Sequence, residues 1–308
     1  MARRNVAHLP ITNNPFLRRK TNVAKSILRW YRTNARTLPW RNIRDPYKVL
    51  VSEIMLQQTQ VSRVLEKFSE FIKRFPSLGA LSRARQSSVV RAWRGMGYNN
   101  RAIRLRQIAR ILVKEFRGTI PAGVDALLQL PGVGPYTAHA LASFVGKAHV
   151  PVVDTNVRRV LARLFPTEAK RMTDWDLAWL TLPRGNAYNW NQALMDFGAT
   201  VCTFAAPKCI SCPLKQSCPS AFKKSEKRKT GAKVEPGKNG IPNRIYRGRI
   251  IEILRGLPRN AGLHFSALGQ NVLTGYGERD AAWLRRILSA LERDGLVMRK
   301  KNIVALAD

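Results

Sequence analysis

The sequence predicts a mostly α-helical protein that ends in a small domain of mixed helices and strands. From residue 22 to about residue 116, apolar side chains recur at helical spacing, and few stretches before residue 240 alternate with the period of a strand. Residues 244–308 instead outline three short helices and a hairpin, which is the pattern of a winged helix. A length of 308 residues fits about two domains.

Each expected helix carries an apolar stripe and is bounded by turn residues. In the first part of the chain, the expected helices are residues 25–35, 46–60, 61–75, 82–94 and 100–116. The stripe of the third helix consists of Val64, Leu65, Phe68, Phe71 and Ile72. In the last part, the expected helices are residues 244–255, 265–272 and 278–294, and two short strands flank residues 300–302.

The charge balance points to a polyanionic partner. Lys and Arg number 54 against 19 Asp and Glu, which gives a net charge of +35. Such an excess repels itself, and nucleic acid is the partner that best offsets it, although ribosomal, RNA-binding and membrane-surface roles stay open on charge alone.

Hydrophobic residues make up 45% of the chain, which is enough for a packed core. Because no signal peptide or apolar run of about 18 residues is visible, we expect a cytoplasmic, nucleoid-associated monomer.

All four cysteines lie within 17 residues, as Cys202, Cys209, Cys212 and Cys218. A disulfide is not expected in a reducing compartment, and thiolates are good ligands for zinc or for iron–sulfur clusters. Zinc ribbons pair two C-x2-C knuckles, whereas this C-x6-C-x2-C-x5-C spacing contains one, so it fits a cubane cluster better. Such a cluster can have the purely structural role of holding a loop in place, and the spacing of the cysteines does not imply redox catalysis.

Residues 130–140, LPGVGPYTAHA, have the signature of a helix–hairpin–helix turn. Gly132 and Gly134 allow backbone N–H groups to point outward where the next helix begins with its positive dipole end. Together these groups suit a DNA phosphate without any charged side chain. The alternative is an ordinary Gly-rich turn, and the net charge of +35 favours the DNA-binding interpretation.

Two carboxylates have sequence neighbours that suit glycosidic chemistry. Glu53 lies in the apolar run KVLVSEIML, where burial would raise its pKa and let it act as a general acid. The pattern alone nevertheless favours a Glu on the polar face of an amphipathic helix. Asp154 precedes a helix and suits an N-cap, and a catalytic role requires it to stay ionised, which the helix dipole favours. We therefore expect a raised pKa at Glu53 and a depressed pKa at Asp154.

A set of motifs in this order resembles one protein family. The set comprises PWR (39–41), SEIMLQQTQV (52–61), GMGY (95–98), LPGVGPYTA (130–138), VDTNV (153–157), NQALMDFGA (191–199) and the four cysteines. It is similar to the helix–hairpin–helix DNA glycosylases with an iron–sulfur cluster, and over residues 15–222 it most resembles the MutY-type adenine DNA glycosylases. The resemblance implies a six-helix barrel domain at 38–148 and an iron–sulfur cluster domain made of 15–37 with 149–222. Around them we expect a basic arm at 1–14, a basic linker at 223–243 and the winged-helix-like α+β domain at 244–308.

The resemblance also implies roles for individual residues. Glu53 falls on the catalytic acid, Asp154 on the catalytic aspartate and Asn156 on an asparagine that positions the water. Tyr136 stands where the endonuclease III branch has a catalytic lysine, and since Tyr cannot form a Schiff base, we expect no lyase step. The expected DNA and substrate contacts are Trp40, Arg41, Leu56, Gln58, Thr59, Tyr98, Gly132, Gly134 and Gln192, among which Gln58 and Tyr98 wedge into the duplex. The four cysteines match the ligands of a [4Fe–4S] cluster.

The implied reaction is hydrolysis of the N-glycosidic bond of adenine mispaired with guanine or 8-oxoguanine, on a base flipped out of double-stranded DNA. Two departures from the family pattern matter. Thr155 replaces a common glycine, and residues 244–308 do not resemble the large domain with which MutY enzymes read 8-oxoguanine. Excision of thymine or uracil opposite guanine is therefore an alternative, although the segment QQTQ (57–60) resembles the adenine glycosylases. A non-catalytic DNA-binding damage sensor is a second alternative, against which the presence of Glu53 and Asp154 argues.

The C-terminal segment is rich in cations. They include Arg244, Arg247, Arg249, Arg285, Arg286, Arg299, Lys300 and Lys301. Because this density suits phosphates, we expect residues 244–308 to add DNA affinity more than base choice. The alternative is a small domain that packs on the preceding domain or binds a protein partner.

Overall fold

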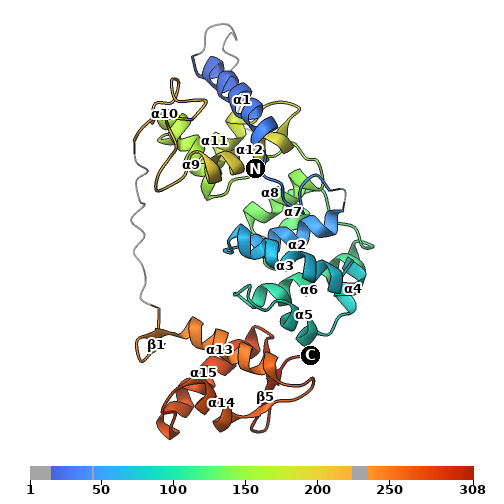
Figure 1. Cartoon of the computed structure of the whole chain (residues 1–308). Helices are drawn as coiled ribbons and strands as arrows, with labels where there is room; N and C mark the ends of the chain where they lie inside the picture. Colours follow the sequence, from blue (N-terminus) through green and yellow to red (C-terminus); the bar gives the residue numbers. More distant parts are fainter. Residues whose placement is uncertain (1–14, 44, 224–234) are drawn as a thin grey trace. The chain divides into compact units, whose positions relative to one another are not determined.

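The computed structural model describes residues 15–43, 45–223 and 235–308. The basic arm expected at 1–14 lies outside these residues, as does most of the linker expected at 223–243. The described chain is mostly helical, as predicted, and its strands all follow residue 236 (Figure 1). It divides into two compact units, of which unit 1 comprises described residues 15–37 and 138–223, and unit 2 comprises 38–137 and 235–308. No helix in the described ranges is long and apolar enough to span a membrane.

Unit 1 packs the first helix of the chain against helices from its middle. The elements are α1 (Pro15–Asn34), most of α8 (Pro135–Phe144), α9 (Thr155–Leu164), α10 (Pro166–Ala169), α11 (Asp174–Thr181) and α12 (Ala187–Thr200). The apolar faces of α1, α9, α11 and α12 form one core that includes Ile27, Trp190 and Phe197, and the ring of Trp30 packs edge-on against Phe197 with centroids 5.2 Å apart. The cysteine loop, residues 201–223, follows α12 and places Leu214 in the same core.

Unit 2 begins with a bundle of short helices. They are α2 (Pro46–Leu56), α3 (Val61–Arg74), α4 (Leu78–Arg83), α5 (Gln86–Ala92), α6 (Asn100–Glu115) and α7 (Val124–Leu128), with the first turn of α8. Three expectations are corrected here. The single helix expected at residues 82–94 is interrupted between α4 and α5, because Ala84 and Arg85 have extended backbone with ψ of 142° and 141°. Helix α2 ends at Leu56 rather than at residue 60, because Gln58 in the next turn has a left-handed φ of 55°. The apolar stripe of α3 is narrower than expected, since Leu65 is 41% exposed and Ile72 is only partly buried.

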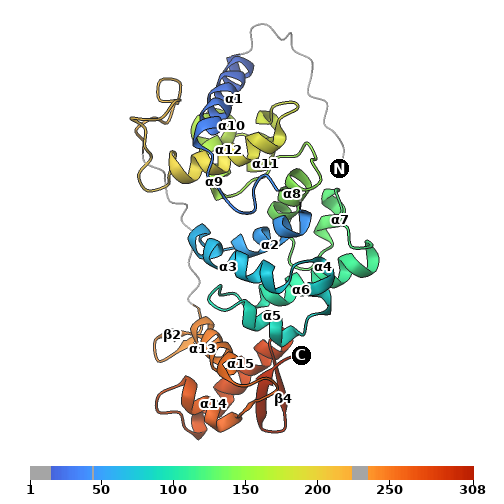
Figure 2. The ribbon, with the colours of Figure 1, turned by 45° about the vertical axis from the view of Figure 1, so that its right-hand side comes forward.

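The last part of unit 2 is a small helix-and-sheet domain, as predicted (Figure 2). Its first elements are β1 (Gly237–Lys238), β2 (Ile241–Pro242), α13 (Asn243–Gly256), α14 (Phe265–Val272), the 3-10 helix η1 (Glu278–Asp280) and α15 (Ala281–Arg293). Strands β3 (Leu263–His264), β4 (Val297–Lys300) and β5 (Ile303–Leu306) form an antiparallel sheet in the order β3-β5-β4. The three expected helices and the hairpin around Lys301 are confirmed, whereas β3 and the β1–β2 hairpin are additional.

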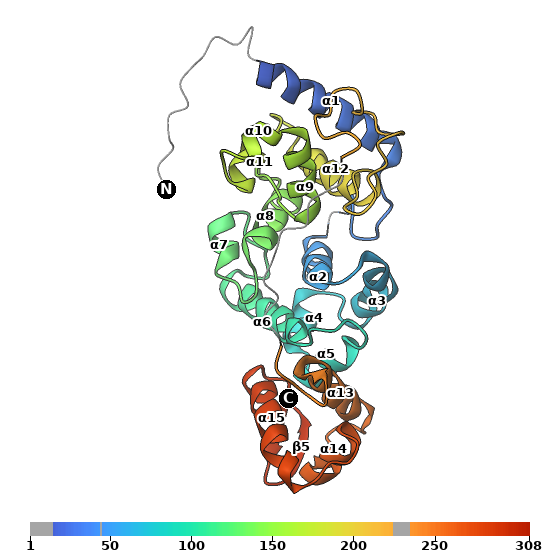
Figure 3. The same ribbon diagram turned by 90° about the vertical axis from the view of Figure 1, so that its left-hand side faces the viewer.

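This C-terminal domain shares a core with α5 and α6 of the same unit. Val90 of α5 and Ile103 of α6 belong to one apolar cluster with Ile251 of α13 and Leu288 of α15. Figure 3 shows α13 beside α5. Residues 235–308 are therefore a docked part of unit 2, which favours the packing alternative for this segment.

Polar contacts secure the same interface. Arg255 is 7% exposed, and it donates from Nε to Val90 O at 2.9 Å and from Nη2 to Asn99 Oδ1 at 2.7 Å. Arg94 forms an ion pair with Glu252 at 2.9 Å. Three of the cations expected to bind phosphate are instead paired with carboxylates of the domain: Arg244 with Glu235, Arg247 with Asp294 and Arg299 with Glu292.

Candidate functional site

Glu53 lies in a helix that is buried on nearly all sides. Asp45 caps the start of α2 by accepting from Tyr47 N at 3.0 Å, and Pro46 suits the first helical position, where no N–H is required. Every residue of 49–55 is buried, and Glu53 itself is 4% exposed. The interpretation of Glu53 as part of an exposed polar face is therefore wrong, because α2 has no such face at this point.

The turn after α2 presents Gln58 to solvent on a strained backbone. Leu56 and Thr59 on either side are partly buried, whereas Gln58 is exposed. Its φ of 55° lies in the left-handed region, which costs a residue other than glycine about 1–3 kcal/mol and persists only when the surroundings hold it. The entry of Gln58 into the duplex stays a prediction.

The turn before α6 repeats this arrangement with Tyr98. The side chain of Tyr98 is 57% exposed, and its φ of 42° is again left-handed. Gly95 and Gly97 supply two further left-handed positions at 81° and 66°, as the tightness of the turn requires. Arg101, at the start of α6, is buried below this turn and donates to Met96 O at 2.8 Å.

The predicted helix–hairpin–helix turn lies in the same unit. Gly132 is exposed and has a φ of 76°, and an added Cβ would lie 2.5 Å from Arg104 Cδ. Gly134 is also exposed and has open space where a Cβ would lie. Gln57 donates to Gly132 O at 3.2 Å and so ties the turn after α2 to this one. Tyr136, the second residue of α8, is partly buried.

Two residues expected near the base pocket are buried in unit 2. Trp40 is 6% exposed and packs edge-on against Phe68 with ring centroids 5.2 Å apart. Arg41 is 8% exposed, and its backbone N–H donates to Leu38 O at 3.0 Å. Their contact with a base stays a prediction.

In unit 1, Asp154 caps the start of α9. Its Oδ1 accepts from Val157 N at 2.6 Å, and its Oδ2 accepts from Asn156 Nδ2 at 2.9 Å. Burial raises the pKa of this carboxyl above its ordinary value, and the hydrogen bonds and Arg159 offset the rise only in part. The expected depression of the Asp154 pKa is therefore wrong in sign, because the sequence reveals the cap but not the burial.

Hydrogen bonds link Asp154 to the cysteine loop within unit 1. Asn156 accepts from Arg159 Nη2 at 2.8 Å, and Arg159 Nε donates to Cys202 O at 2.9 Å. Arg159 Nη2 also donates to Gly198 O at 2.7 Å. An added Cβ on Gly198 would lie 2.6 Å from Asn156 Cβ, so this glycine permits the close approach of α9 and α12 that the hydrogen bonds require.

The start of the NQALMDFGA motif is buried on α12. Asn191 accepts from Val152 N at 3.1 Å and donates to Val150 O at 2.9 Å, so it fixes the segment that leads to Asp154. Gln192 is 6% exposed, and its contact with substrate stays a prediction.

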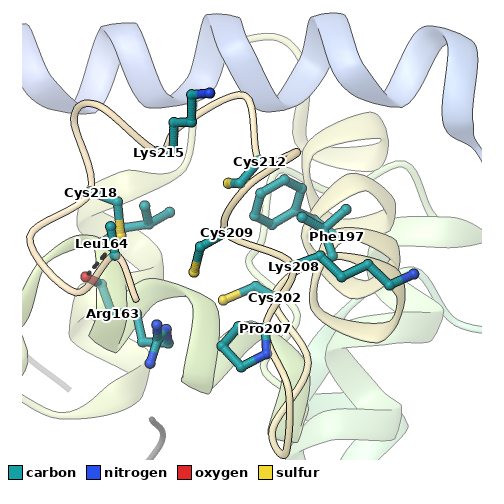
Figure 4. Close-up of a pocket in the computed structure, with 12 residues that line it drawn as sticks. Arg163, Leu164, Phe197, Cys202, Pro207, Lys208, Cys209, Cys212, Lys215 and Cys218 are labelled. Carbon is teal, nitrogen blue, oxygen red and sulfur yellow. Dashed lines mark hydrogen bonds between the residues drawn. The ribbon is translucent and has the colours of Figure 1, made fainter. Parts of the chain in front are cut away.

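The four cysteines line one pocket of unit 1, and Figure 4 shows their side chains around a common space. Two backbone N–H groups face the sulfur atoms, since Leu214 N lies 3.4 Å from Cys212 Sγ and Phe222 N lies 3.3 Å from Cys209 Sγ. Hydrogen bonds of this kind stabilise thiolates and tune iron–sulfur clusters. The predicted ligand set is thus brought together by the loop.

The thiols of this pocket are the kind of donor that suits a soft metal centre. Arg163, Lys208 and Lys215 line the pocket with the thiols, and Arg163 and Arg159 favour the charged form of Cys202. Burial raises the pKa of Cys202 and of Cys212, so deprotonated thiols here need a compensating positive centre. In the part of the chain that the structure describes, no group of three or more His, Cys, Asp or Glu side chains is arranged to hold a single metal ion.

The predicted site residues fall into both units. Glu53, the three turns and Tyr136 belong to unit 2, whereas Asp154, Asn156, Gln192 and the cysteines belong to unit 1. Sequence reasoning missed the buried polar residues Arg101, Arg159 and Asn191. Arg101 could have been found, because it continues the buried stripe of α6 that contains Leu105, Ile108 and Leu112.

Known proteins resemble this chain over parts of both units. Residues 51–178 match the family described as "HhH-GPD superfamily base excision DNA repair protein". The adenine DNA glycosylase of Mycobacterium tuberculosis is 36% identical over 283 residues, which cover 89% of this chain and 90% of that protein. The adenine DNA glycosylase of Mycolicibacterium smegmatis is 46% identical over 193 residues, which cover 61% of this chain. The matches span 66% of this second protein and 57% of an adenine DNA glycosylase of Buchnera aphidicola.

A solved structure described as a thermostable thymine-DNA glycosylase is similar in fold. It has a TM-score of 0.63 and 29% sequence identity, and the match covers 67% of this chain and 98% of that one. The chain therefore belongs to the HhH-GPD superfamily of base excision DNA repair proteins and, within it, to the family of the adenine DNA glycosylases.

Proposed function

We propose that this protein is a monofunctional glycosylase of base excision repair that removes adenine mispaired with guanine or 8-oxoguanine from double-stranded DNA. The observation that carries the proposal is the 36% identity to the adenine DNA glycosylase of Mycobacterium tuberculosis over 89% of this chain, with Glu53 and Asp154 in place. The match covers 90% of that relative, so the similarity extends well beyond residues 51–178.

The two carboxylates are proposed to divide the chemistry between them. Burial disfavours the charged form of Glu53, which can then give its proton to N7 of adenine. The C1′–N9 bond breaks with its electron pair on the base, and ionised Asp154 stabilises the sugar cation. Asn156 donates to Asp154 and orients the water, which attacks C1′ and gives one proton to the solvent, leaving an abasic site.

The exposed turns of unit 2 are proposed to contact the duplex. Gln58 and Tyr98 enter it and replace the stacking that is lost when the base is flipped out. Gly132 and Gly134 offer backbone N–H groups to a phosphate at the start of α8. The remaining substrate contacts are assigned to Trp40, Arg41, Leu56, Thr59 and Gln192.

Tyr136 is proposed to make the enzyme monofunctional. Its phenol offers no amine, so no Schiff base with the abasic sugar can form at this position. We expect borohydride to trap no covalent adduct with DNA, and Tyr136→Lys to gain some. Efficient trapping by the unaltered protein would contradict the assignment.

The four cysteines are proposed to hold a [4Fe–4S] cluster, which when bound braces the cysteine loop and its cations Lys208 and Lys215. Purified protein should then be brown, and Cys212→Ser should lose visible absorption, folding yield and DNA affinity. A colourless preparation with one zinc ion per chain would refute this part of the proposal.

Removal of thymine or uracil opposite guanine is the second candidate. The likeness to a thymine-DNA glycosylase, at 29% identity, favours it. It ranks lower because the identities to adenine DNA glycosylases are 36% and 46%. A non-catalytic damage sensor ranks last, since both carboxylates are present.

One experiment separates the three candidates. The full chain is incubated with duplexes that contain A·8-oxoG, A·G, T·G or U·G, and abasic sites are revealed by alkaline cleavage. Abasic sites at adenine support the proposal. Abasic sites at thymine or uracil support the second candidate, and binding without any abasic site supports the sensor.

A further inference from the structure

Arg101 joins the two turns that carry Gln58 and Tyr98. It is the second residue of α6 and is 4% exposed. From Nη1 it donates to the end of α2, with acceptors Ile54 O at 3.2 Å, Met55 O at 2.8 Å and Gln57 O. From Nη2 it donates to both turns, with acceptors Thr59 Oγ1 at 2.9 Å, Met96 O at 2.8 Å and Gly97 O at 3.1 Å.

Further contacts fix the guanidinium in this place. Its carbon lies 5.4 Å from the ring centroid of Trp93 and 5.5 Å from that of Tyr98. Thr59 Oγ1 donates to Met96 O at 3.4 Å, which joins the two turns directly. Burial lowers the pKa of Arg101 to about 10, so the group stays charged at neutral pH.

The two turns have a feature in common that requires such support. Gln58 and Tyr98 have left-handed φ values of 55° and 42°, and both side chains are exposed. Neither conformation is favourable for a residue with a Cβ, so each persists only if neighbouring groups hold it. The acceptors of Arg101 are backbone carbonyls at the end of α2 and in these two turns, apart from one threonine hydroxyl.

We propose that Arg101 is a positioning residue for base extrusion, which holds Gln58 and Tyr98 in one fixed arrangement so that both enter the duplex together. This inference rests on the proposed function, which gives the two side chains their role in the duplex. An arginine is required because its planar fork has five donors, whereas the single ammonium of lysine cannot serve both turns at once.

The first test uses the free protein and needs no substrate. Backbone hydrogen exchange is compared in full-length protein, in Arg101→Lys and in Arg110→Lys, which changes an exposed arginine of the same helix. We expect Arg101→Lys to speed exchange in residues 55–60 and 95–100 together, with α13 to α15 unchanged and Arg110→Lys like the parent. Loosening of a single turn, or of unit 2 throughout, would overturn the inference.

The second test measures extrusion and rate on DNA. In a Glu53→Gln background, the fluorescence of 2-aminopurine opposite guanine reports unstacking of an adenine analogue at saturating protein. Arg101→Lys should lower this fluorescence gain, while affinity for a matched duplex is kept. With Glu53 intact, the single-turnover rate at saturation should fall by about 10²-fold, the loss typical of a group displaced by ~1 Å.

A double-mutant cycle distinguishes positioning from general damage. If Arg101 acts through Tyr98, the effect of Tyr98→Ala on the single-turnover rate shrinks in the Arg101→Lys background. Additive effects would overturn the inference. Thr59→Val, which removes one acceptor and keeps the side-chain shape, serves if Arg101→Lys does not fold, and it should show the same coupling at smaller size.

Failure of this inference is distinguishable from failure of the proposed function. If the parent protein leaves adenine in every duplex, the proposed function fails, while the exchange experiment still decides whether Arg101 couples the turns. If the parent releases adenine and Arg101→Lys releases it equally fast, only the inference about Arg101 fails.

Discussion

Glu53 of unit 2 and Asp154 of unit 1 are both carboxylates, but the first lies within a helix and the second at the start of one. Glu53 lies within α2, where every residue from 49 to 55 is buried. Asp154 lies where α9 begins, and it accepts from a backbone N–H and from the amide of Asn156. Burial raises the pKa of Asp154, and the hydrogen bonds that it accepts offset this rise only in part. In the proposed function, the glutamate acts as the acid and the aspartate as the stabilising anion.

Each unit also contains an arginine that joins the segment of its carboxylate to another segment. In unit 2, Arg101 donates to backbone carbonyls of α2 and of the turn before α6. In unit 1, Arg159 connects Asn156 to the carbonyl of Cys202. Both arginines are used for their several donors rather than for an ion pair, which is why each can fix more than one segment.

The largest expected effect is that of Glu53→Gln, which tests the proposed proton donor. Glu53→Gln should lower the single-turnover rate of base release by about 10³-fold, because an amide cannot supply the proton. Duplex binding should stay nearly unchanged, as measured by fluorescence anisotropy. Glu66→Gln, at an exposed ion pair of α3, is the control and should keep full activity. Substantial turnover by Glu53→Gln would remove it from the role of acid.

Asp154→Asn tests whether the second carboxylate acts by charge or by capping. Asparagine caps a helix about as well as aspartate, so the melting temperature should change little. The single-turnover rate should nevertheless fall by about 10²-fold, because the sugar cation loses its anionic partner. The matched control is Asp45→Asn, the same change at the N-cap of α2. If the rate is kept, the cap is the whole function of Asp154.

Arg255→Met tests the bracing of unit 2 by its C-terminal domain. The change leaves Val90 O and Asn99 Oδ1 without a buried donor and should cost about 1–3 kcal/mol of unfolding free energy. The comparison is Arg249→Met, at an exposed site on the same helix, in urea denaturation. Equal midpoints for the two variants would show that the domain is held by apolar contact alone.

The pH profile sharpens the comparison of the two carboxylates. Since burial raises the pKa of Asp154, its ionised fraction is lost at a higher pH than for an ordinary aspartate as the pH falls. The hydrogen bond from Asn156 lowers this pKa, so Asn156→Ala should raise it further and move the acid limb of the single-turnover rate to higher pH. Asn189→Ala, at an exposed asparagine of α12, should leave the acid limb in place. A shift to lower pH would contradict the electrostatic account.

The smallest effect concerns the phosphate contacts of the C-terminal domain. With Arg244, Arg247 and Arg299 paired to carboxylates, Lys300 and Lys301 at the β4–β5 turn are the remaining cations of that hairpin for a phosphate. If they contact DNA, replacing either by Ala lowers the log–log salt slope of binding by ~0.9 without changing which base is released. An unchanged slope would limit the domain to its packing role.

Local patterns in the sequence predicted some elements closely and left others open. Helix α14 has the expected limits of residues 265 and 272, since its periodicity and flanking residues are local features. Helix α2 was expected to reach residue 60, because no Gly or Pro in QQTQ marks the left-handed turn at Gln58 that ends it. The burial of Glu53 also depends on neighbours that are distant in the sequence.

The cysteines and the Gly-rich turns were accessible to sequence reasoning because their spacing or residue type is itself the constraint. The pKa of Asp154 was not, since its N-cap is local while its burial comes from tertiary packing. For the same reason, a lone Arg101 in an apolar stripe could be noticed in the sequence, but its seven acceptors could not be named.

The shared core of unit 2 has a consequence for how the chain folds. Val90 and Ile103 pack with Ile251 and Leu288, so nearly two hundred residues of sequence separate partners in one cluster. Unit 1 likewise joins α1 to α12. Contacts of such long range slow folding, because the loop entropy is lost before the contact energy is gained. During synthesis, Val90 of α5 and Ile103 of α6 therefore stay exposed until α13 and α15 have been made. A chain whose synthesis ends before residue 243 would leave this part of the unit 2 core exposed to solvent.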